Sequence, residues 1–238
     1  MPKKNGSNAS NGVSYAFDIA NNGNNLHIPL KKKIVNTAKT KNQKLLLQSI
    51  NENIITVSYG HCGSGKTRLA VLEGLKLFFE KKVERLIFTR PCVEANNEHL
   101  GYIPGTINEK LEPFMTPIFD FLNEYIEQKY VEQLISARKI ITLPLAFMRG
   151  TTFTNAYVLG DEFQNTVPSQ IRMFLTRIGE NCKVVITGDI NQTDIDEKNG
   201  LVDACERLTD IKGLNFVKLN EVDICRHPIV AKIEEKYR

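Results

Sequence analysis

The chain has 238 residues, of which 42% are hydrophobic and 24% are charged, and its formal net charge is +4. This length and apolar content suit one α/β domain with a buried sheet rather than two full domains. No apolar run is long enough to cross a membrane and no apolar segment follows the first lysines, so we expect a cytoplasmic protein without membrane contact. The five cysteines are scattered along the chain, which argues against a disulfide framework or a zinc site.

Residues 1–37 are predicted to form a flexible tail. They are rich in Asn, Ser and Gly, as in residues 21–25, and show no sustained apolar periodicity. Such a segment buries too little apolar surface to offset the entropy that it would lose on ordering. The lysine run at 31–33 is either an attraction site for nucleic-acid phosphates or a solvated segment, and we favour the solvated segment.

From residue 42 the pattern alternates between strands and helices. Apolar runs typical of strands occupy residues 54–59, 85–89, 140–143, 156–159, 183–187 and 215–219. Helical patterns occupy residues 68–80, 107–126, 131–137, 169–178 and 201–208, with a closing helix from 228; Pro113 and Pro117 interrupt the second of them. This alternation predicts a three-layer α/β fold with a mostly parallel sheet between helices, in which ligands bind at the carboxyl ends of the strands.

The segment at 60–67 reads GHCGSGKT, which fits the P-loop pattern G-x-x-x-x-G-K-[ST]. Small residues let backbone N–H groups surround a phosphate, Lys66 reaches the β- and γ-oxygens, and the Thr67 hydroxyl holds Mg²⁺. An incidental glycine-rich turn is the alternative, but an apolar strand before and a helix after the segment favour the P-loop. The residues expected to contact the nucleotide are Gly60, Gly63, Ser64, Gly65, Lys66, Thr67 and Arg68.

Asp161 and Glu162 directly follow the apolar run at 156–159, which places two carboxylates at the ligand edge of the sheet. Asp161 is expected to bind the metal ion, and Glu162 to orient and deprotonate the attacking water. Acidic residues after strands are otherwise often helix caps. A water-activating group favours an ATPase over a kinase, while Gly160 is unexpected because an apolar branched residue would pack better there.

Two glutamines are further candidates. Gln192 follows the strand at 183–187 and would reach the γ-phosphate as a sensor, although the segment also fits an ordinary turn. Gln43 precedes the P-loop by one helix and one strand, and would hydrogen-bond an adenine edge; an isolated glutamine is otherwise a surface residue.

Several motifs together resemble the PhoH family over about residues 38–238. They are Gln43, GHCGSGKT at 60–67, TRP at 89–91, LGYIPG at 100–105, MRGTTF at 148–153, DEFQN at 161–165, LTRIG at 175–179, TGD at 187–189 with Gln192, and Arg226 with His227. The resemblance implies an ATPase domain similar to the first RecA-like domain of superfamily one helicases, which uses ATP and Mg²⁺ and acts with RNA or single-stranded DNA.

The same resemblance assigns roles to single residues. Gln43 would recognise adenine, Lys66 and Thr67 would bind phosphate and Mg²⁺, and Asp161 with Glu162 would form the Walker B pair. Gln192 would sense the γ-phosphate and Arg226 would be an arginine finger. Gly160 and Phe163 depart from the family's commoner apolar residue and alanine, which puts the packing around the pair in question.

Three functions follow as hypotheses. The favoured one is an ATPase that couples hydrolysis to binding or remodelling RNA or single-stranded DNA as a homo-oligomer, expected to be a hexameric ring with Arg226 delivered across a subunit boundary. A cis role for Arg226 is the alternative. A kinase is disfavoured by Glu162, and a nucleotide-regulated binding protein with little hydrolysis is the third hypothesis.

Three arginines are candidates for contacts with nucleic acid. Arg90, Arg149 and Arg177 lie in or near the motifs at the sheet edge, where they would line a groove for phosphates. Salt bridges within the fold are an equally good interpretation of these side chains.

Overall fold

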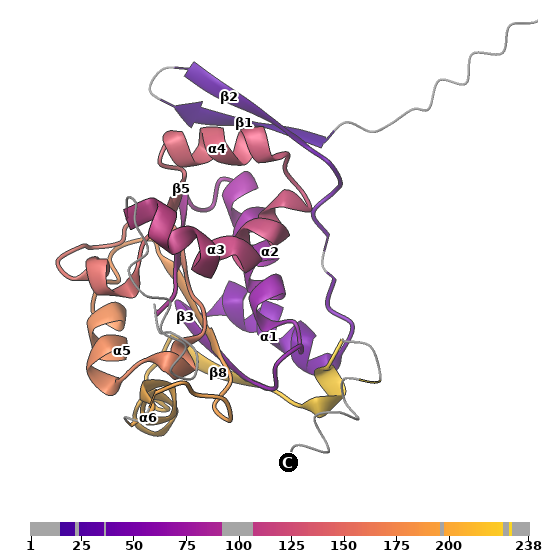
Figure 1. Ribbon diagram of the computed structural model, residues 1–238. Coiled ribbons are helices and arrows are strands. Elements are labelled where there is room, and N and C mark those ends of the chain that lie inside the picture. The colour runs from indigo at the N-terminus through magenta and orange to yellow at the C-terminus, as the bar shows by residue number, and fades with distance from the viewer. Residues whose placement is uncertain are drawn as a thin grey trace, which may run out of the picture.

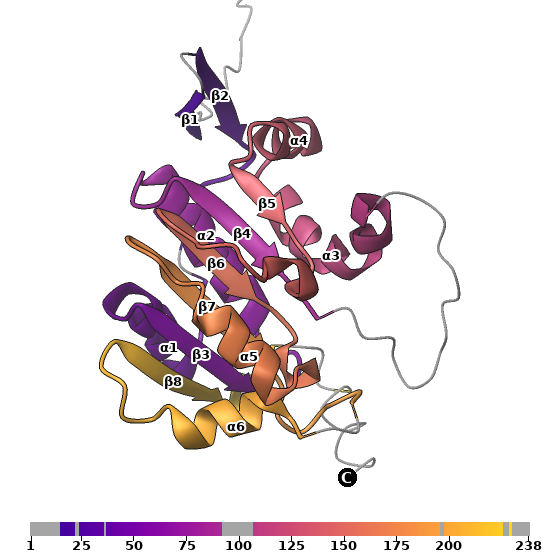
Figure 2. The same cartoon turned by 90° about the vertical axis from the view of Figure 1, so that its left-hand side faces the viewer.

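A six-stranded parallel sheet forms the centre of the fold. The computed structural model describes residues 15–21, 24–35, 37–91, 107–195, 198–225 and 229. In this part of the chain the strands run in the order β5-β4-β6-β7-β3-β8, and all neighbouring pairs are parallel (Figure 2). The strands are β3 (Ile55–Gly60), β4 (Arg85–Thr89), β5 (Ile140–Thr142), β6 (Ala156–Gly160), β7 (Lys183–Gly188) and β8 (Leu214–Leu219). All six predicted strands are confirmed.

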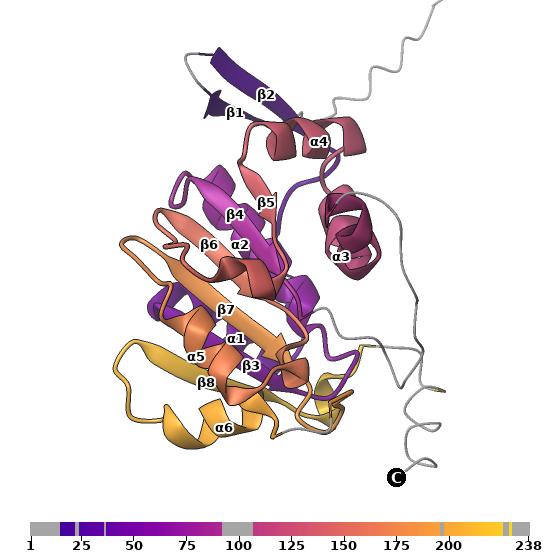
Figure 3. The same cartoon turned by 60° about the vertical axis from the view of Figure 1, so that its left-hand side comes forward.

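Helices cover both faces of this sheet, as the alternating pattern predicts (Figure 3). One face carries α1 (Lys41–Glu52) and α2 (Lys66–Phe79), and the opposite face carries α5 (Pro168–Leu175) and α6 (Gly200–Arg207). The strands alternate accordingly: Leu86 and Phe88 of β4 are buried in the core with α1 and α2, and Ile87 is buried in the second core with α5 and α6. A strand buried on both faces needs the near-continuous apolar runs seen in the sequence.

Short segments connect these elements at the ends of the strands. They include the 3₁₀ turns η1 (Leu145–Met148), η2 (Phe163–Asn165) and η3 (Glu221–Asp223). The predicted closing helix from 228 and the LGYIPG motif at 100–105 lie outside the described residues, apart from residue 229.

Helix α3 (Ile107–Asn123) continues through Pro113 and Pro117, so the predicted interruption is wrong. Each proline removes one backbone hydrogen bond, but Met115 and Ile118 of this helix are buried in the core against α2. This burial offsets the missing bonds. Helix α4 (Gln128–Ser136) follows beside β5. Among the described helices, we find none with the length and apolar character that a bilayer crossing requires.

Residues 15–30 do not form the predicted tail. They fold as an antiparallel hairpin of β1 (Tyr15–Asn21) and β2 (Asn24–Leu30), which lies above α4 in Figure 1. Ile19 and Ile28 are buried, and the ring of Phe17 lies 4.6 Å from that of Phe79 at the end of α2. The alternating apolar residues form one buried face, which stabilises the hairpin. Residues 1–14 lie outside the described part of the chain.

Candidate nucleotide-binding site

The P-loop joins β3 to α2, as predicted, and its backbone conformation favours glycine at Gly60, Gly63 and Gly65, all of which have positive φ. Gly60 has a φ of 129°, and a Cβ there would lie 1.8 Å from the carbonyl oxygen of Leu219 on β8. Gly65 has a φ of 85° and caps α2 without a side-chain hydrogen bond. The first N–H groups of α2 therefore have no cap from this residue, and a helix N-terminus of this kind favours an anion.

Lys66 is the first residue of α2 and is 8% exposed. Its Nζ donates to the carbonyl oxygens of Gly60 at 2.6 Å and of His61 at 2.8 Å. Burial lowers the pKa of Lys66, and the negative charge of Asp189 opposes this shift. The ammonium is thus held at the centre of the loop by weak backbone acceptors, which a phosphate can replace with stronger, charge-assisted bonds.

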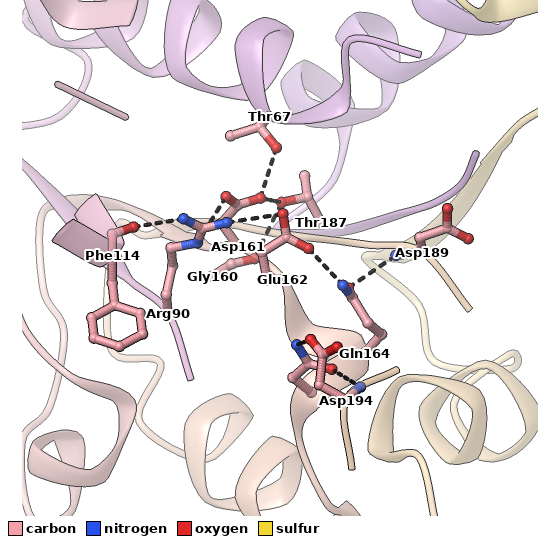
Figure 4. A network of polar contacts seen from close by, with 11 residues as sticks. Thr67, Arg90, Phe114, Gly160, Asp161, Glu162, Gln164, Thr187, Asp189 and Asp194 are labelled. Carbon is pink, nitrogen blue, oxygen red and sulfur yellow. Dashed lines mark hydrogen bonds and ion pairs between the residues drawn. The ribbon is translucent and has the colours of Figure 1, made fainter. Parts of the chain in front are cut away.

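Asp161 lies just after β6 and is 2% exposed (Figure 4). Its Oδ1 accepts hydrogen bonds from the hydroxyls of Thr67 at 2.7 Å and Thr187 at 2.5 Å. Its Oδ2 lies 3.3 Å from Nε of Arg90. Burial raises the pKa of Asp161, while the guanidinium of Arg90 and the two hydroxyls oppose that shift. The carboxylate is therefore shielded from water and neutralised by an ion pair.

Glu162 adopts a left-handed backbone with a φ of 57°, which turns its side chain into the same network. Its Oε1 pairs with Nη2 of Arg90 at 2.9 Å, and its Oε2 accepts from Nε2 of Gln164 at 2.5 Å. The side chain is 41% exposed, so it is far more accessible to water than Asp161. A strained left-handed residue is typical of functional sites.

Gln164 and Asp189 join this network to the P-loop. Oε1 of Gln164 accepts from the backbone N–H of Asp189 at 3.0 Å, and Oδ2 of Asp189 accepts from the N–H of Cys62 at 2.9 Å. Sequence reasoning gave no role to either residue. The available signal was their position directly after β6 and β7, because parallel strands end at one edge of the sheet.

A cavity of about 480 Å³ opens between these groups. Gln192, which is exposed on the loop after β7, lines it together with the P-loop and the carboxylate pair. Arg68 also lines it, but its guanidinium pairs with Glu124 at 3.0 Å and donates to Thr37 at 3.0 Å. The structure thus brings Lys66, Thr67, Arg68, Asp161, Glu162 and Gln192 to one cavity. The roles given to them remain predictions.

Gln43 lies beside the P-loop and is 3% exposed. Its Oε1 accepts from the N–H groups of Lys39 and Thr40, and its Nε2 donates to the carbonyls of Ser64 at 3.0 Å and Asp223 at 3.3 Å. These bonds link the start of α1 to the P-loop and to the segment after β8. Adenine recognition by Gln43 stays a prediction, since in this structure its amide contacts protein groups.

Gly160 and Phe163 form a complementary pair. A Cβ on Gly160 would lie 2.5 Å from the ring of Phe163, and that ring is fully buried with an edge contact to Phe174 at 4.9 Å. The glycine is therefore required by the aromatic ring next to it. This answers the question about packing that Gly160 raises in the sequence.

The pair of Thr67 and Asp161 fits the metal site that the sequence predicts. Hydroxyl and carboxylate oxygens are the ligands preferred by Mg²⁺, which is usually held by one or two carboxylates together with water and substrate phosphates. Within the described residues no group of three or more His, Cys, Asp or Glu side chains offers an all-protein metal site.

Of the other predicted residues, Arg90 takes part in ion pairs with both carboxylates, which favours the salt-bridge interpretation. Arg149 is exposed, and Arg177 is half-buried with a bond from Nη2 to Thr176 at 3.3 Å. Arg226 lies outside the described residues, so its finger role stays a prediction.

The fold and site together define a P-loop NTPase with a RecA-like α/β core. The P-loop strand β3 lies between β7 and β8, and β7 separates it from β6, which carries the acidic pair. The model of the PhoH-like protein family matches residues 35–238, and the chain belongs to this family.

Curated relatives agree with this assignment. The chain is 44% identical to the PhoH-like protein of Synechocystis over 202 residues, which is 84% of this chain and 61% of that protein. It is 41% identical to the PhoH-like protein of Bacillus subtilis, covering 84% and 63%, and 34% identical to Protein PhoH of Escherichia coli, covering 84% and 57%. The chain thus spans about three-fifths of the length of these relatives.

Solved structures show more distant similarity. The Sulfolobus solfataricus SWI2/SNF2 ATPase core in complex with double-stranded DNA matches with a TM-score of 0.40 and 13% identity, over 66% of this chain and 34% of that one. A structure of Pif1 helicases on forked double-stranded DNA matches with a TM-score of 0.33 and 14% identity, over 77% and 44%.

Proposed function

We propose that this PhoH-like chain binds ATP with Mg²⁺ and hydrolyses it to ADP and phosphate. The observation that carries the proposal is the convergence of Lys66, Thr67, Asp161, Glu162 and Gln192 on one cavity of about 480 Å³. These residues come from separate segments of the sequence, and a glycine-rich turn without a ligand would need none of them together.

The P-loop supplies the phosphate contacts. N–H groups at the start of α2 and the ammonium of Lys66 bind the β- and γ-phosphates. Thr67 and Asp161 would hold Mg²⁺, which when bound neutralises charge on the phosphate oxygens. Glu162 accepts a proton from the attacking water as its oxygen bonds to the γ-phosphorus and ADP leaves. Gln192 lies on the loop after β7 and senses the γ-phosphate.

A measurement of ADP formation and phosphate release from ATP tests this proposal. Equal amounts of both products support hydrolysis. ADP without free phosphate would indicate transfer to an acceptor, as in a kinase, and the absence of both products would contradict catalysis. A binding protein with little hydrolysis is the second candidate, because Arg90 and Gln164 hold both carboxylate oxygens of Glu162.

We further propose RNA or single-stranded DNA as the partner. The exposed guanidinium of Arg149 and the partly exposed one of Arg177 are the groups suited to phosphate contacts, whereas Arg90 already pairs with two carboxylates. Binding to phosphates releases counterions, so affinity should fall as salt rises. Titration of labelled RNA and single-stranded DNA between low and high salt, with ATP turnover followed in parallel, tests this; tight binding without salt dependence would contradict it.

A homo-oligomeric ring completes the proposal. Phosphoryl transfer gains strongly from an arginine that neutralises charge on the γ-phosphate, in cis or in trans, and a head-to-tail contact that closes makes a ring. We assign that arginine to Arg226 of a neighbouring subunit in a hexamer. Mixing inactive Lys66→Ala and Arg226→Ala chains should then restore part of the activity. Co-assembled mixtures that stay inactive would contradict the trans role.

A further inference from the structure

Arg90 occupies the centre of the acidic network (Figure 4). Its guanidinium lies 3.3 Å from Asp161 through Nε and 2.9 Å from Glu162 through Nη2, and Nη1 donates to the carbonyl of Phe114 on α3 at 2.6 Å. The side chain is 14% exposed. One cation therefore bridges the two carboxylates that the proposed reaction needs for separate roles.

The sheet register produces this arrangement. Thr89 at the end of β4 pairs with Gly160 at the end of β6, and the N–H of Asp161 donates to the carbonyl of Thr89 at 2.9 Å. The next residue on each strand, Arg90 on one and Asp161 on the other, is thus placed side by side by main-chain bonds. Their pairing follows from the fold itself and does not depend on a flexible surface contact.

The buried carboxylate of Asp161, with that of Glu162 next to it, needs a positive charge close by. Lys66 directs its ammonium to carbonyl oxygens of the P-loop, so the ion pairs of Asp161 and Glu162 in the described structure are made with Arg90. A metal ion bound by Thr67 and Asp161 would bring a second cation to the carboxylate that Arg90 already contacts. Two cations on one carboxylate repel each other.

We propose that Arg90 is a placeholder cation, a positioning residue that gives up Asp161 to the incoming metal ion while it keeps Glu162 in place. The distances support this division. The contact with Asp161 is the longer of the two ion pairs, and the bonds to Glu162 and to Phe114 hold the guanidinium after Asp161 is released. This role rests on the proposed metal-dependent use of ATP and adds a residue to it.

A placeholder role and a purely structural role for Arg90 predict different effects on metal binding. If Arg90 competes with the ion, its removal must strengthen metal binding, because Asp161 and Glu162 are left with unbalanced negative charge. If Arg90 merely stabilises the fold, its removal leaves metal affinity unchanged or weakens it as the site loosens. Metal affinity therefore separates the two roles.

The first experiment titrates Mn²⁺ alone into the full chain and measures free Mn²⁺ by electron paramagnetic resonance. Arg90→Gln should bind Mn²⁺ roughly tenfold more tightly than the wild type, since a unit charge within ion-pair distance is removed. Arg172→Gln is the matched control: it removes the same charge from an exposed arginine on α5 and should bind like the wild type. Equal affinity in the two variants, or weaker binding by Arg90→Gln, would overturn the proposal.

The second experiment uses the wild-type chain, so it does not depend on the folding of a variant. The Nε–H signal of Arg90, assigned by its loss in Arg90→Lys, is followed by ¹⁵N magnetic resonance. Saturation with Mg²⁺, alone and with ADP, should shift this signal while the Nε–H signal of Arg172, which is exposed on α5, stays in place. A signal from Arg90 that does not move would overturn the placeholder role.

ATP turnover then separates this proposal from the proposed function. Arg90→Gln should lower kcat at saturating Mg²⁺ with little change in KM for ATP. The reason is that Glu162 loses the ion pair that positions it, whereas the P-loop is intact. A wild-type chain that fails to hydrolyse ATP would refute the hydrolysis proposal, while the Mn²⁺ comparison would still decide whether Arg90 competes with the metal ion.

Discussion

The P-loop and the acidic edge of the sheet are built in opposite ways. In the P-loop, Lys66 and Ser64 donate to carbonyls that lie three to six residues away in sequence. At the acidic edge, the partners of Asp161 come from α2, from the end of β4 and from β7. One half of the site is a local motif, whereas the other half exists only once the sheet has formed.

This difference predicts that substitutions in the two halves of the site affect stability and ligand binding to different extents. A change of Lys66 or Ser64 removes ligand contacts and leaves the sheet intact, since the hydrogen bonds that these side chains donate are internal to the loop. A change at the acidic edge alters contacts between strands, so it affects both stability and ligand binding. Four comparisons of variants test this division, from the largest expected effect to the smallest.

Lys66→Ala should abolish nucleotide binding with little loss of stability. Two charge-assisted phosphate contacts of about 1.5–3 kcal/mol each are lost, which corresponds to an affinity lower by a factor on the order of 1000. Calorimetric titration with ATP measures the affinity, and Lys44→Ala on the exposed side of α1 is the control. Unchanged ATP affinity and turnover in Lys66→Ala would refute the P-loop assignment.

Glu162→Gln should bind ATP but hydrolyse it roughly 100-fold more slowly, because an amide cannot accept the proton of the attacking water. Single-turnover measurements at saturating ATP separate this step from binding. Glu127→Gln, which removes an exposed carboxylate before α4, should behave like the wild type. A wild-type rate in Glu162→Gln would assign the base to another group.

The fold was predictable where the sequence pattern is local. Strands buried on both faces appear as short apolar runs, and all of the predicted strands form. The hairpin of β1 and β2 differs from the predicted tail because the tail prediction rests on the polar composition of the segment and not on its alternating pattern. Asp18 lies between Phe17 and Ile19, His27 lies between Leu26 and Ile28, and an Asn-Gly pair at 22–23 lies between the two segments. That combination is a strong hairpin signal.

The same distinction between local and assembled structure explains how much of the site can be predicted from the sequence. The P-loop motif specifies its own geometry, so eight consecutive residues are enough to predict the roles of Lys66 and Thr67. The positions of Arg90 and Thr187 beside Asp161 depend on the pairing of β4 and β7 with β6. Strand order and register are set by the whole sheet, and no short motif encodes them.

Gly160→Ala and Phe163→Ala should be strongly coupled in stability. A methyl group on Gly160 overpacks the ring of Phe163 and costs about 1–3 kcal/mol in the otherwise wild-type chain. Once Phe163 is alanine, the space is open and the same methyl group costs little. Urea unfolding of both single variants and the double variant should give a coupling of about 1–2 kcal/mol. Additive effects would mean that the ring moves away without cost.

The smallest effect compares one hydroxyl from each half of the site. Ser64 donates to the carbonyl of His61 at 2.7 Å inside the P-loop, and Thr187 donates to the buried carboxylate of Asp161 at 2.5 Å. A hydrogen bond between neutral groups contributes about 0.5–1.5 kcal/mol, and one to a charged group about 1.5–3 kcal/mol. Thr187→Val should therefore lower the free energy of unfolding by about 1 kcal/mol more than Ser64→Ala does. Both variants are measured by urea unfolding without nucleotide. If Ser64→Ala is the more destabilising of the two, the P-loop contributes to the stability of the fold as strongly as the acidic edge, and the division between a local and an assembled half is wrong.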